Sequence, residues 1–211
     1  MQEGTELNRR SDELNTLEHS DNRRKDTRNY LLVAALRLLA EHGYAGVTTG
    51  QIAKAAGIKQ PSFYAHFESR DACIAESIRN EGRLLAERLA QRRQNLPTAG
   101  GTIAQDFVEM GFTLLLNYLS ERGDFMRVLN GLLDAPNLAG DAVRDVLTLL
   151  RDQLVSDLPR FGVADLPDLS MRADFLISMV GQAERGVRMG HYDLREVAQY
   201  LTKQTFGLFE A

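Results

Sequence analysis

The sequence predicts an all-α protein of about nine helices, and two observations carry this prediction. Apolar residues recur every three or four positions through nearly the whole chain, which is the spacing of one helix face. The segments with this spacing start at polar capping residues and end at Gly or Pro, as helices do. Together these patterns indicate a small amino-terminal three-helix domain and a larger helical domain after it.

The first elements are predicted from residues 23–70. An apolar stripe ends at Gly43 and predicts the first helix (Leu31, Leu32, Ala35, Leu38 and Leu39). Thr48 followed by Gln51 has the capping-box spacing, so a second helix is expected to begin at Thr49. Gly57 can adopt the positive φ that ends this helix and turns the chain. A third helix is expected from residue 59 onward, with a proline in its first turn.

Longer stripes of apolar residues predict the later helices. The apolar spacing predicts a long helix over about residues 71–95, and others over about 107–123, 124–136 and 143–158. The penultimate helix is expected over about 175–187. The last is expected to start at Asp193, with Glu196 three positions on as an acidic relative of the capping box. The predicted organisation is therefore a mobile tail over 1–22, a small helical domain over 23–70 and a larger helical domain over 71–211.

Composition narrows the class of protein. A hydrophobic fraction of 44% in 211 residues is ordinary for a globular protein with a buried core. The longest apolar runs, such as 31–36, fall short of the roughly 18 residues of a membrane span. No secretory signal is visible at residues 1–15. The single cysteine, Cys73, fits a reducing compartment, so we expect a cytoplasmic protein without a membrane partner.

Charge is distributed unevenly along the chain. Residues 22–70 contain eight Lys or Arg against three acidic residues, whereas residues 1–21 contain two against six. Since the whole chain carries a formal charge of −4, residues 71–211 carry −5. A basic module beside an acidic body indicates an anionic partner for the module alone.

Two short helices joined by a glycine turn, with the apolar Ile58 behind the turn, are typical of a helix-turn-helix. The second helix of such a unit presents its first residues to base edges in the major groove. Here these residues are Lys59, Gln60, Pro61, Ser62 and Tyr64, of which Lys suits guanine and Gln suits adenine. Phosphate contacts are expected from a flexible basic arm and from residues around the unit: Arg24, Lys25, Arg28, Thr48, Thr49, His66 and Arg70. On spacing alone, an alternative interpretation remains: an ordinary helical hairpin whose polar face is only exposed to solvent.

The motif continues beyond this spacing. Gly43-Tyr44, Thr48, Ile52-Ala53, Ala56-Gly57-Ile58 and Tyr64-x-x-Phe67-x-x-Arg70 resemble the DNA-binding domain of TetR/AcrR transcriptional regulators. The resemblance covers about residues 25–80, and the rest of the chain agrees only in length and helical pattern. It implies a dimeric regulator, generally a repressor, that binds a palindromic operator, with a DNA-binding domain over 23–70 and an effector-binding and dimerisation domain over 71–211. It also implies that an effector in the second domain changes operator affinity, through the long helix that joins the domains.

Two positions depart from the family's usual pattern. Arg70 stands where the family commonly has Lys, and its planar fork also suits phosphate. Pro61 stands where Gly is common. We therefore expect this helix to recognise a base sequence that differs from the familiar operators of the family.

The dimer and the effector pocket are expected in the second domain. Close approach at Gly181 and Gly186, and the apolar stripes around them, predict a four-helix dimer interface: Val180, Ala183, Val187, Val197, Leu201 and Leu208. The alternative is that these stripes pack inside one chain. Soft and aromatic side chains predict a pocket for a small apolar effector, such as a fatty acyl compound or a hydrophobic drug: Phe107, Met110, Leu114, Phe125, Met126, Leu129, Phe175 and Met179. Each of these residues is also an ordinary core candidate.

Other function classes have weaker support. The four histidines show no metal-ligand spacing, and no phosphate loop, HExxH or GxSxG is present in the sequence. We therefore expect no enzymatic activity, no metal and no cofactor apart from an unidentified small-molecule effector. A helical protein-binding adaptor without DNA binding is the remaining alternative.

Overall fold

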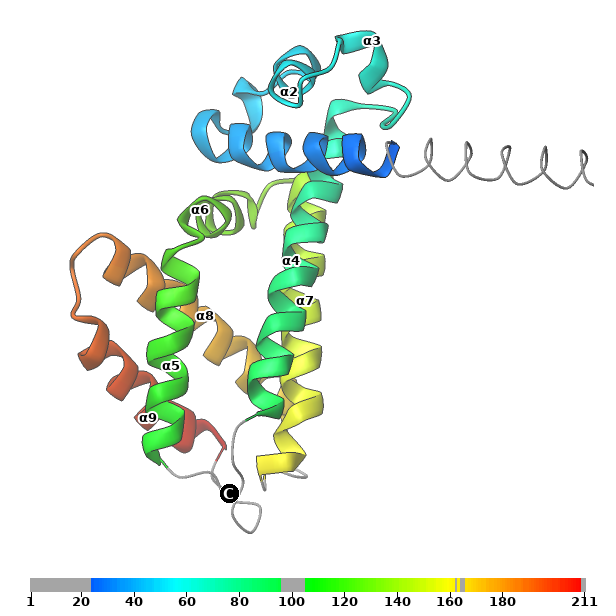
Figure 1. Ribbon diagram of the computed structural model, residues 1–211. Coiled ribbons are helices and arrows are strands. Elements are labelled where there is room, and N and C mark those ends of the chain that lie inside the picture. The colour runs from blue at the N-terminus through cyan, green and yellow to red at the C-terminus, as the bar shows by residue number, and fades with distance from the viewer. Residues whose placement is uncertain (1–23, 96–104, 162, 164–165, 210–211) are drawn as a thin grey trace, which may run out of the picture. The chain divides into compact units, whose positions relative to one another are not determined.

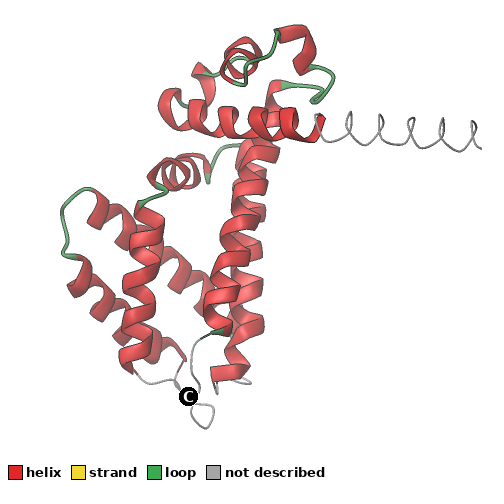
Figure 2. Ribbon diagram, in the orientation of Figure 1, coloured by secondary structure: helices red, strands yellow, loops and turns green. Residues whose placement is uncertain are grey.

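The computed structural model describes residues 24–95, 105–161, 163 and 166–209. All the regular structure in these residues is helical, with short loops between the helices (Figure 2). The chain divides into two compact units between Ile74 and Ala75. The mobile tail expected over 1–22 lies outside the described residues. The all-α prediction is confirmed, with nine α-helices in the part of the chain that is described.

The first unit holds three helices and the start of a fourth (Figure 1). Residues 24–42 are helical; the one-turn 3₁₀ helix η1 follows at Tyr44–Gly46, then α2 at Thr49–Ala55 and α3 at Gln60–Phe63. Its core is formed by side chains with almost no exposed area, from every helix of the unit: Leu31, Ala35, Ile52, Phe63 and Ile74. The apolar stripe predicted over residues 31–39 is fully buried, as expected.

The second unit is built from α4 to α9. Their bounds are α4 Arg70–Gln94, α5 Gln105–Ser120, α6 Gly123–Leu132, α7 Leu138–Asp157, α8 Leu169–Arg188 and α9 Leu194–Phe209, with the 3₁₀ helix η2 at Leu158–Phe161. One buried cluster joins α5, α8 and α9, and its members include Phe112, Leu116, Leu176, Ala198 and Leu201. In Figure 1, α5 lies beside α9, and α4 runs beside α7.

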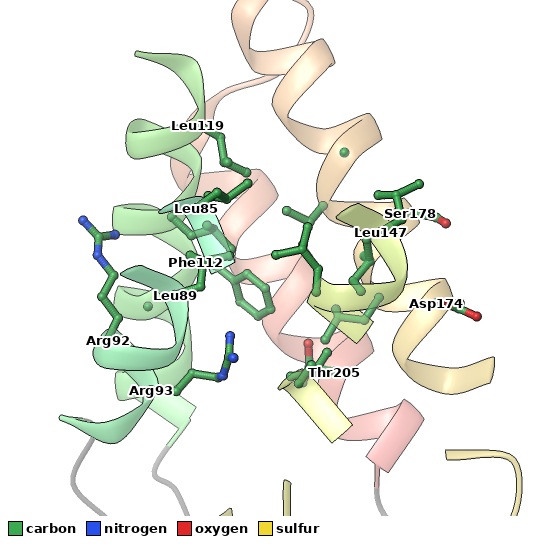
Figure 3. Close-up of a pocket in the computed structure, with 18 of the residues that line it drawn as sticks. Leu85, Leu89, Arg92, Arg93, Phe112, Leu119, Leu147, Asp174, Ser178 and Thr205 are labelled. Carbon is green, nitrogen blue, oxygen red and sulfur yellow. The ribbon is translucent and has the colours of Figure 1, made fainter. Parts of the chain in front are cut away.

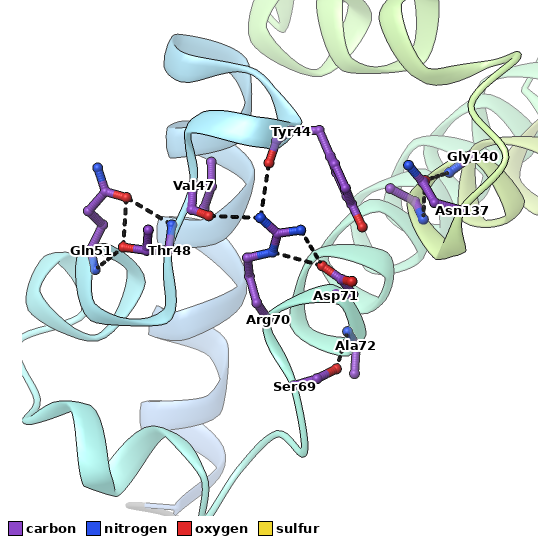
Figure 4. Close-up of polar contacts among 11 residues, drawn as sticks. Tyr44, Val47, Thr48, Gln51, Ser69, Arg70, Asp71, Ala72, Asn137 and Gly140 are labelled. Atoms are coloured by element: carbon purple, nitrogen blue, oxygen red, sulfur yellow. Dashed lines mark hydrogen bonds and ion pairs between the residues drawn. The ribbon is translucent and has the colours of Figure 1, made fainter.

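Caps and close contacts position these helices. Asn137 accepts hydrogen bonds from the backbone N–H groups of Ala139 and Gly140 at 3.1 and 3.0 Å and so begins α7 (Figure 4). Asp193 accepts from the N–H groups of Arg195 and Glu196, which confirms the start expected for the last helix. At Gly82, α4 approaches α7 so closely that a Cβ atom would overlap the Val146 side chain.

In the described residues, no helix combines the length and the apolar character needed to cross a membrane.

Candidate functional site

The start of α2 has the predicted capping box (Figure 4). The Gln51 N–H donates to Thr48 Oγ1 at 3.2 Å, and the Thr48 N–H donates to Gln51 Oε1 at 2.8 Å. Both donors would otherwise lack a partner in the helix. The reciprocal pair therefore sets where α2 begins and how the chain enters it.

A sharp turn separates α2 from α3. Gly57 has φ +74°, and its N–H donates to the Lys54 carbonyl at 3.1 Å. The N–H of Ile58 donates to the Ala53 carbonyl at 3.0 Å, which completes the turn after the helix. The left-handed conformation predicted for Gly57 is confirmed, and it allows the two helices to face different directions within five residues.

Helix α3 is short and presents its polar residues to solvent. Lys59 is the N-cap and is followed by Pro61 in the first turn, as expected from the sequence. The predicted base-reading residues of this segment are all exposed: Lys59, Gln60, Pro61, Ser62 and Tyr64. Phe63, between them, is fully buried, and its ring meets those of Tyr64 and Phe67 at 5.5 and 5.7 Å. The buried Phe63 side chain thus fixes α3 to the core, while the polar side chains on both sides of it remain exposed.

Some of the predicted DNA contacts are already engaged within the domain. The side chain of Gln60 donates from Nε2 to Thr49 Oγ1 at 3.1 Å, and Thr48 is engaged in the capping box. Both threonines stand at the start of α2, next to the first turn of α3. This arrangement holds the amide of Gln60 in place without a ligand.

The basic segment before residue 30 differs from the expected flexible arm. Arg24, Lys25 and Arg28 all lie within the helix of residues 24–42. Arg24 donates to the Ala65 carbonyl at 3.1 Å, and Arg28 donates to the His66 carbonyl. The Arg28 guanidinium also stacks over the Phe67 ring at 4.1 Å. The prediction of a flexible arm is wrong for these residues, because all three lie in a helix, and Arg24 and Arg28 tie that helix to the end of the helix-turn-helix.

His66 lies under this pair of arginines. Its Nδ1 atom is buried and has no hydrogen-bond partner within the described residues. Burial, together with the nearby charges of Arg24 and Arg28, lowers the pKa of the imidazole below its usual value of 6.5. His66 is therefore neutral at pH 7, and its side chain supplies no positive charge for a phosphate contact.

Arg70 is a bridge inside the first unit (Figure 4). Its guanidinium donates to the carbonyls of Tyr44 and Val47 at 3.3 and 3.1 Å, and it pairs with Asp71 at 2.7 Å. It also lies over the Tyr44 ring, 4.6 Å from the ring centroid. Every nitrogen of the guanidinium has a protein partner, so Arg70 closes the loop before α2 onto α4 instead of extending toward a phosphate.

The second unit contains a large cavity of about 1090 Å³. Its wall is mainly apolar and is formed by residues of α4 to α9, with Leu85, Leu89, Phe112, Leu119 and Leu147 among those drawn in Figure 3. A cavity of this size holds a drug-sized or larger molecule. Three of the predicted pocket residues line it: Leu114, Met126 and Leu129.

The other predicted pocket residues lie elsewhere. Phe107, Met110 and Phe175 are 46%, 59% and 54% exposed and are not part of the wall. Phe125 is buried away from the cavity, and Met179 packs against the core cluster. Apart from Leu114, the α5 residues that line the cavity, such as Gly111, Phe112 and Leu115, lie on another face of the same helix. Residue type predicted a pocket here, but not which face of α5 forms it.

Polar side chains interrupt this wall in a few places. Arg93 Nη2 and Asn130 Nδ2 are buried donors without a partner in the described chain, and both residues line the cavity. Figure 3 shows the Arg93 guanidinium turned toward the middle of the cavity, whereas the Arg92 side chain points away from it. Buried donors ordinarily bond to protein, water or a ligand.

The predicted dimer residues are partly in the core of this chain. Leu201 is 1% exposed and Ala183 is 9% exposed, and both belong to the buried cluster. They have almost no area left for a second copy, so the prediction is wrong for these two positions. Val180, Val197 and Leu208 pack against the same cluster and Val187 is half-buried. The large exposed apolar side chains here are different ones: Met171 and Phe175 on α8, Met189 directly after it, and Tyr200 on α9.

Comparison with known proteins points to one family. Residues 31–76 match the model of bacterial regulatory proteins of the tetR family. An uncharacterised HTH-type transcriptional regulator of Haemophilus influenzae is 30% identical over 95 residues, which is 44% of this chain and 46% of that protein. The matched segment thus spans less than half the length of this curated relative.

Solved structures extend the similarity over the whole fold. A structure from Mesorhizobium loti, ascribed to the TetR family, superposes with a TM-score of 0.71 at 14% identity, and covers 88% of this chain and 97% of that one. The regulator FadR of Bacillus subtilis, in complex with stearoyl-CoA, superposes with a TM-score of 0.65 at 15% identity, over 86% of this chain and 97% of that chain. At these identities the likeness concerns the fold.

Proposed function

We propose that this chain is a transcriptional regulator that binds an operator in double-stranded DNA, because residues 31–76 match the model of bacterial regulatory proteins of the tetR family. The observation that carries the proposal is the row of exposed polar residues on α3, held by the buried Phe63. Recognition helices of this type place such residues in the major groove. The family consists of transcription regulators and not of enzymes.

The proposed reading of the operator rests on four side chains. Lys59 donates to guanine, Gln60 pairs with adenine, and the hydroxyls of Ser62 and Tyr64 serve bases or phosphates. Thr48 and Thr49 at the start of α2, and Lys25 on the first helix, contribute phosphate contacts. Pro61 sets the start of α3 and shapes the surface beside these tips.

One recognition helix contacts few base pairs, so the protein is proposed to act as a homodimer on a palindromic operator. Half-sites would be about one helical turn, ~34–36 Å, apart. The exposed apolar side chains of α8 and α9, including Phe175 and Tyr200, supply area for a second copy. The buried residues of the predicted stripe, Ala183 and Leu201, instead pack in the core of the same chain.

The cavity is proposed to bind a small, mainly apolar effector that changes operator affinity. Its wall supports this ligand class, with fatty acyl compounds and hydrophobic drugs as examples. FadR, which has the same fold, was solved with stearoyl-CoA. A ligand that prefers one conformation of the second unit shifts the population and hence the operator affinity, because α4 carries residues of both units. A repressor released by its ligand is the proposed direction.

A gel-shift assay on the DNA upstream of the protein's own coding sequence tests the proposal. We expect a salt-sensitive shift that Lys59→Ala or Tyr64→Ala abolishes, while the dimer and its Tm stay nearly unchanged. Arg83→Ala, on an exposed part of α4, serves as the matched loss of a positive charge. If no genomic fragment shifts, or if both α3 variants bind as well as the wild type, the proposal is wrong and a protein-binding adaptor is favoured.

A further inference from the structure

Among the described residues that line the cavity, Arg93 is a cation whose side chain faces the interior. Arg93, near the carboxyl end of α4, is 18% exposed, and its guanidinium turns toward the cavity beside Phe112 (Figure 3). Its Nε atom is bound by Asp157 Oδ2 at 2.6 Å. Its Nη2 atom is buried and has no partner in the described parts of the chain. A charged donor left in this state costs free energy unless a water or a ligand accepts from it.

More positive charge gathers around the ring of Tyr118 on α5. Arg92 lies 5.0 Å from the centroid of the Tyr118 ring, Arg122 lies 3.8 Å from it, and Arg88 lies 5.7 Å from it. Glu81 is the carboxylate paired with this group, 3.5 Å from Arg122, among the residues that are described. Arg92 also donates to the Leu114 carbonyl at 3.1 Å, and both residues are part of the cavity wall.

The summed charge therefore favours an anion at this end of the cavity. Arg93 pairs with Asp157 and Arg122 pairs with Glu81, whereas Arg88 and Arg92 have no carboxylate partner among the described residues, so two positive charges remain there. The acid in the cavity wall, Asp174, lies 3.7 Å from Arg151, and in Figure 3 its side chain points away from the cavity. Within a mainly apolar wall, a charge-assisted bond is stronger than a bond between neutral groups.

We propose that the ligand of this cavity is an anionic amphiphile, with its apolar part along the leucine-rich wall and its carboxylate or phosphate head accepting a hydrogen bond from Arg93 Nη2. This inference rests on the proposed effector function and narrows it. A neutral apolar drug would fill the same volume and leave the Arg93 donor without a partner.

The charge of the ligand's head group is tested with three probes that share a twelve-carbon alkyl chain: dodecanoate, dodecyl phosphate and 1-dodecanol. By calorimetry on the full chain, we expect at least one anionic probe to bind about 10-fold more tightly than the alcohol, the gain typical of a hydrogen bond to a charged group. Which of the two anions binds more tightly distinguishes a carboxylate head from a phosphate head.

Variants of the ion pair separate ligand binding from folding. Asp157→Asn keeps the shape but removes the competing charge, so we expect it to increase the preference for the anionic probe. Arg93→Gln combined with Asp157→Asn replaces the pair by two neutral amides, and we expect the preference to disappear while dodecanol affinity stays unchanged. Arg83→Gln, an exposed arginine of the same helix, is the matched control and should bind all three probes like the wild type.

Three results would overturn the inference. These are equal affinity of the wild type for all three probes, an unchanged preference in the double variant, and no binding of any dodecyl probe. Equal binding of all probes, with release of DNA by each, rejects the anionic head but leaves the proposed function standing. Loss of the gel shift itself would instead reject the regulator.

Discussion

The Gln60 side chain donates from Nε2 to Thr49 Oγ1 at 3.1 Å, and so links the first turn of α3 to the first turn of α2. Both residues are expected at the DNA surface, but they have different roles in this bond. In the proposed complex, Gln60 exchanges this partner for a base edge, whereas Thr49 orients the amide and contacts a phosphate instead of a base.

Substitution of these two residues separates base reading from positioning. We expect Gln60→Ala to relax the preference at one operator position and to cost about 1–3 kcal/mol there. Thr49→Val should leave the preferred sequence unchanged, because a base can still satisfy the Gln60 amide. Selection of bound sequences from a random DNA pool measures both effects. If Thr49→Val changes the selected base and Gln60→Ala does not, the roles are reversed.

Removal of the Arg70 bridge should destabilise the first unit. Arg70→Ala leaves the carbonyls of Tyr44 and Val47 without this donor, and we expect a loss of about 1–3 kcal/mol in the free energy of unfolding. Arg70→Lys should recover only part of it, because an ammonium group cannot reproduce the planar fork. Urea unfolding followed by circular dichroism measures the change. Equal stability of wild type and Arg70→Ala would show that these bonds do not stabilise the fold. The bridging role assigned to Arg70 would then be wrong.

A pair of glycines tests the approach of α4 to α7. Gly82→Ala places a methyl group into the Val146 side chain, and we expect it to destabilise the protein by about 1–3 kcal/mol. Gly111→Ala has open space around the added Cβ atom, so the better helix propensity of Ala should stabilise α5 by up to about 1 kcal/mol. Thermal unfolding of both variants measures the difference. A similar Tm for the two would mean that α4 and α7 can move apart at no cost.

The partly buried ring of His66 should make stability depend on pH. Burial and the charges of Arg24 and Arg28 lower its pKa in the folded state, so the unfolded chain takes up a proton first as the pH falls. The contribution of the neutral ring is complete above the unfolded pKa of about 6.5 and is lost as the pH falls through the lowered folded pKa. His66→Gln should flatten this part of the profile in denaturation experiments between pH 7.5 and 5. An unchanged profile would exclude His66 as its source.

The sequence predicted local structure correctly at positions where a residue type strongly favours one backbone role, such as a helix cap or a left-handed turn. The Thr48–Gln51 capping box, the positive φ of Gly57 and the Asp193 cap were all predicted and are all present. These are decided within a few residues of the chain, so composition and spacing are sufficient to predict them.

Long-range partners were not predictable in this way. The residues Arg24, Arg28 and Arg70 have the charge expected of DNA contacts, and only the fold shows that each donates to a backbone carbonyl far along the chain. Arg93 was missed because a single cation in the last turn of a helix has no signal of its own in the sequence.

The sequence by itself determined the all-helical class, the ends of the helix-turn-helix and the exposed row on α3, because these depend on helix periodicity and on backbone conformation. The tertiary structure decided which stripe of α5 faces the cavity and which stripes of α8 and α9 are buried. Met110 and Phe112 are only two residues apart and equally apolar, yet one is exposed and the other lines the cavity. Several faces of an apolar helix can be buried, and the choice among them is made by the neighbouring helices, which a single sequence does not place.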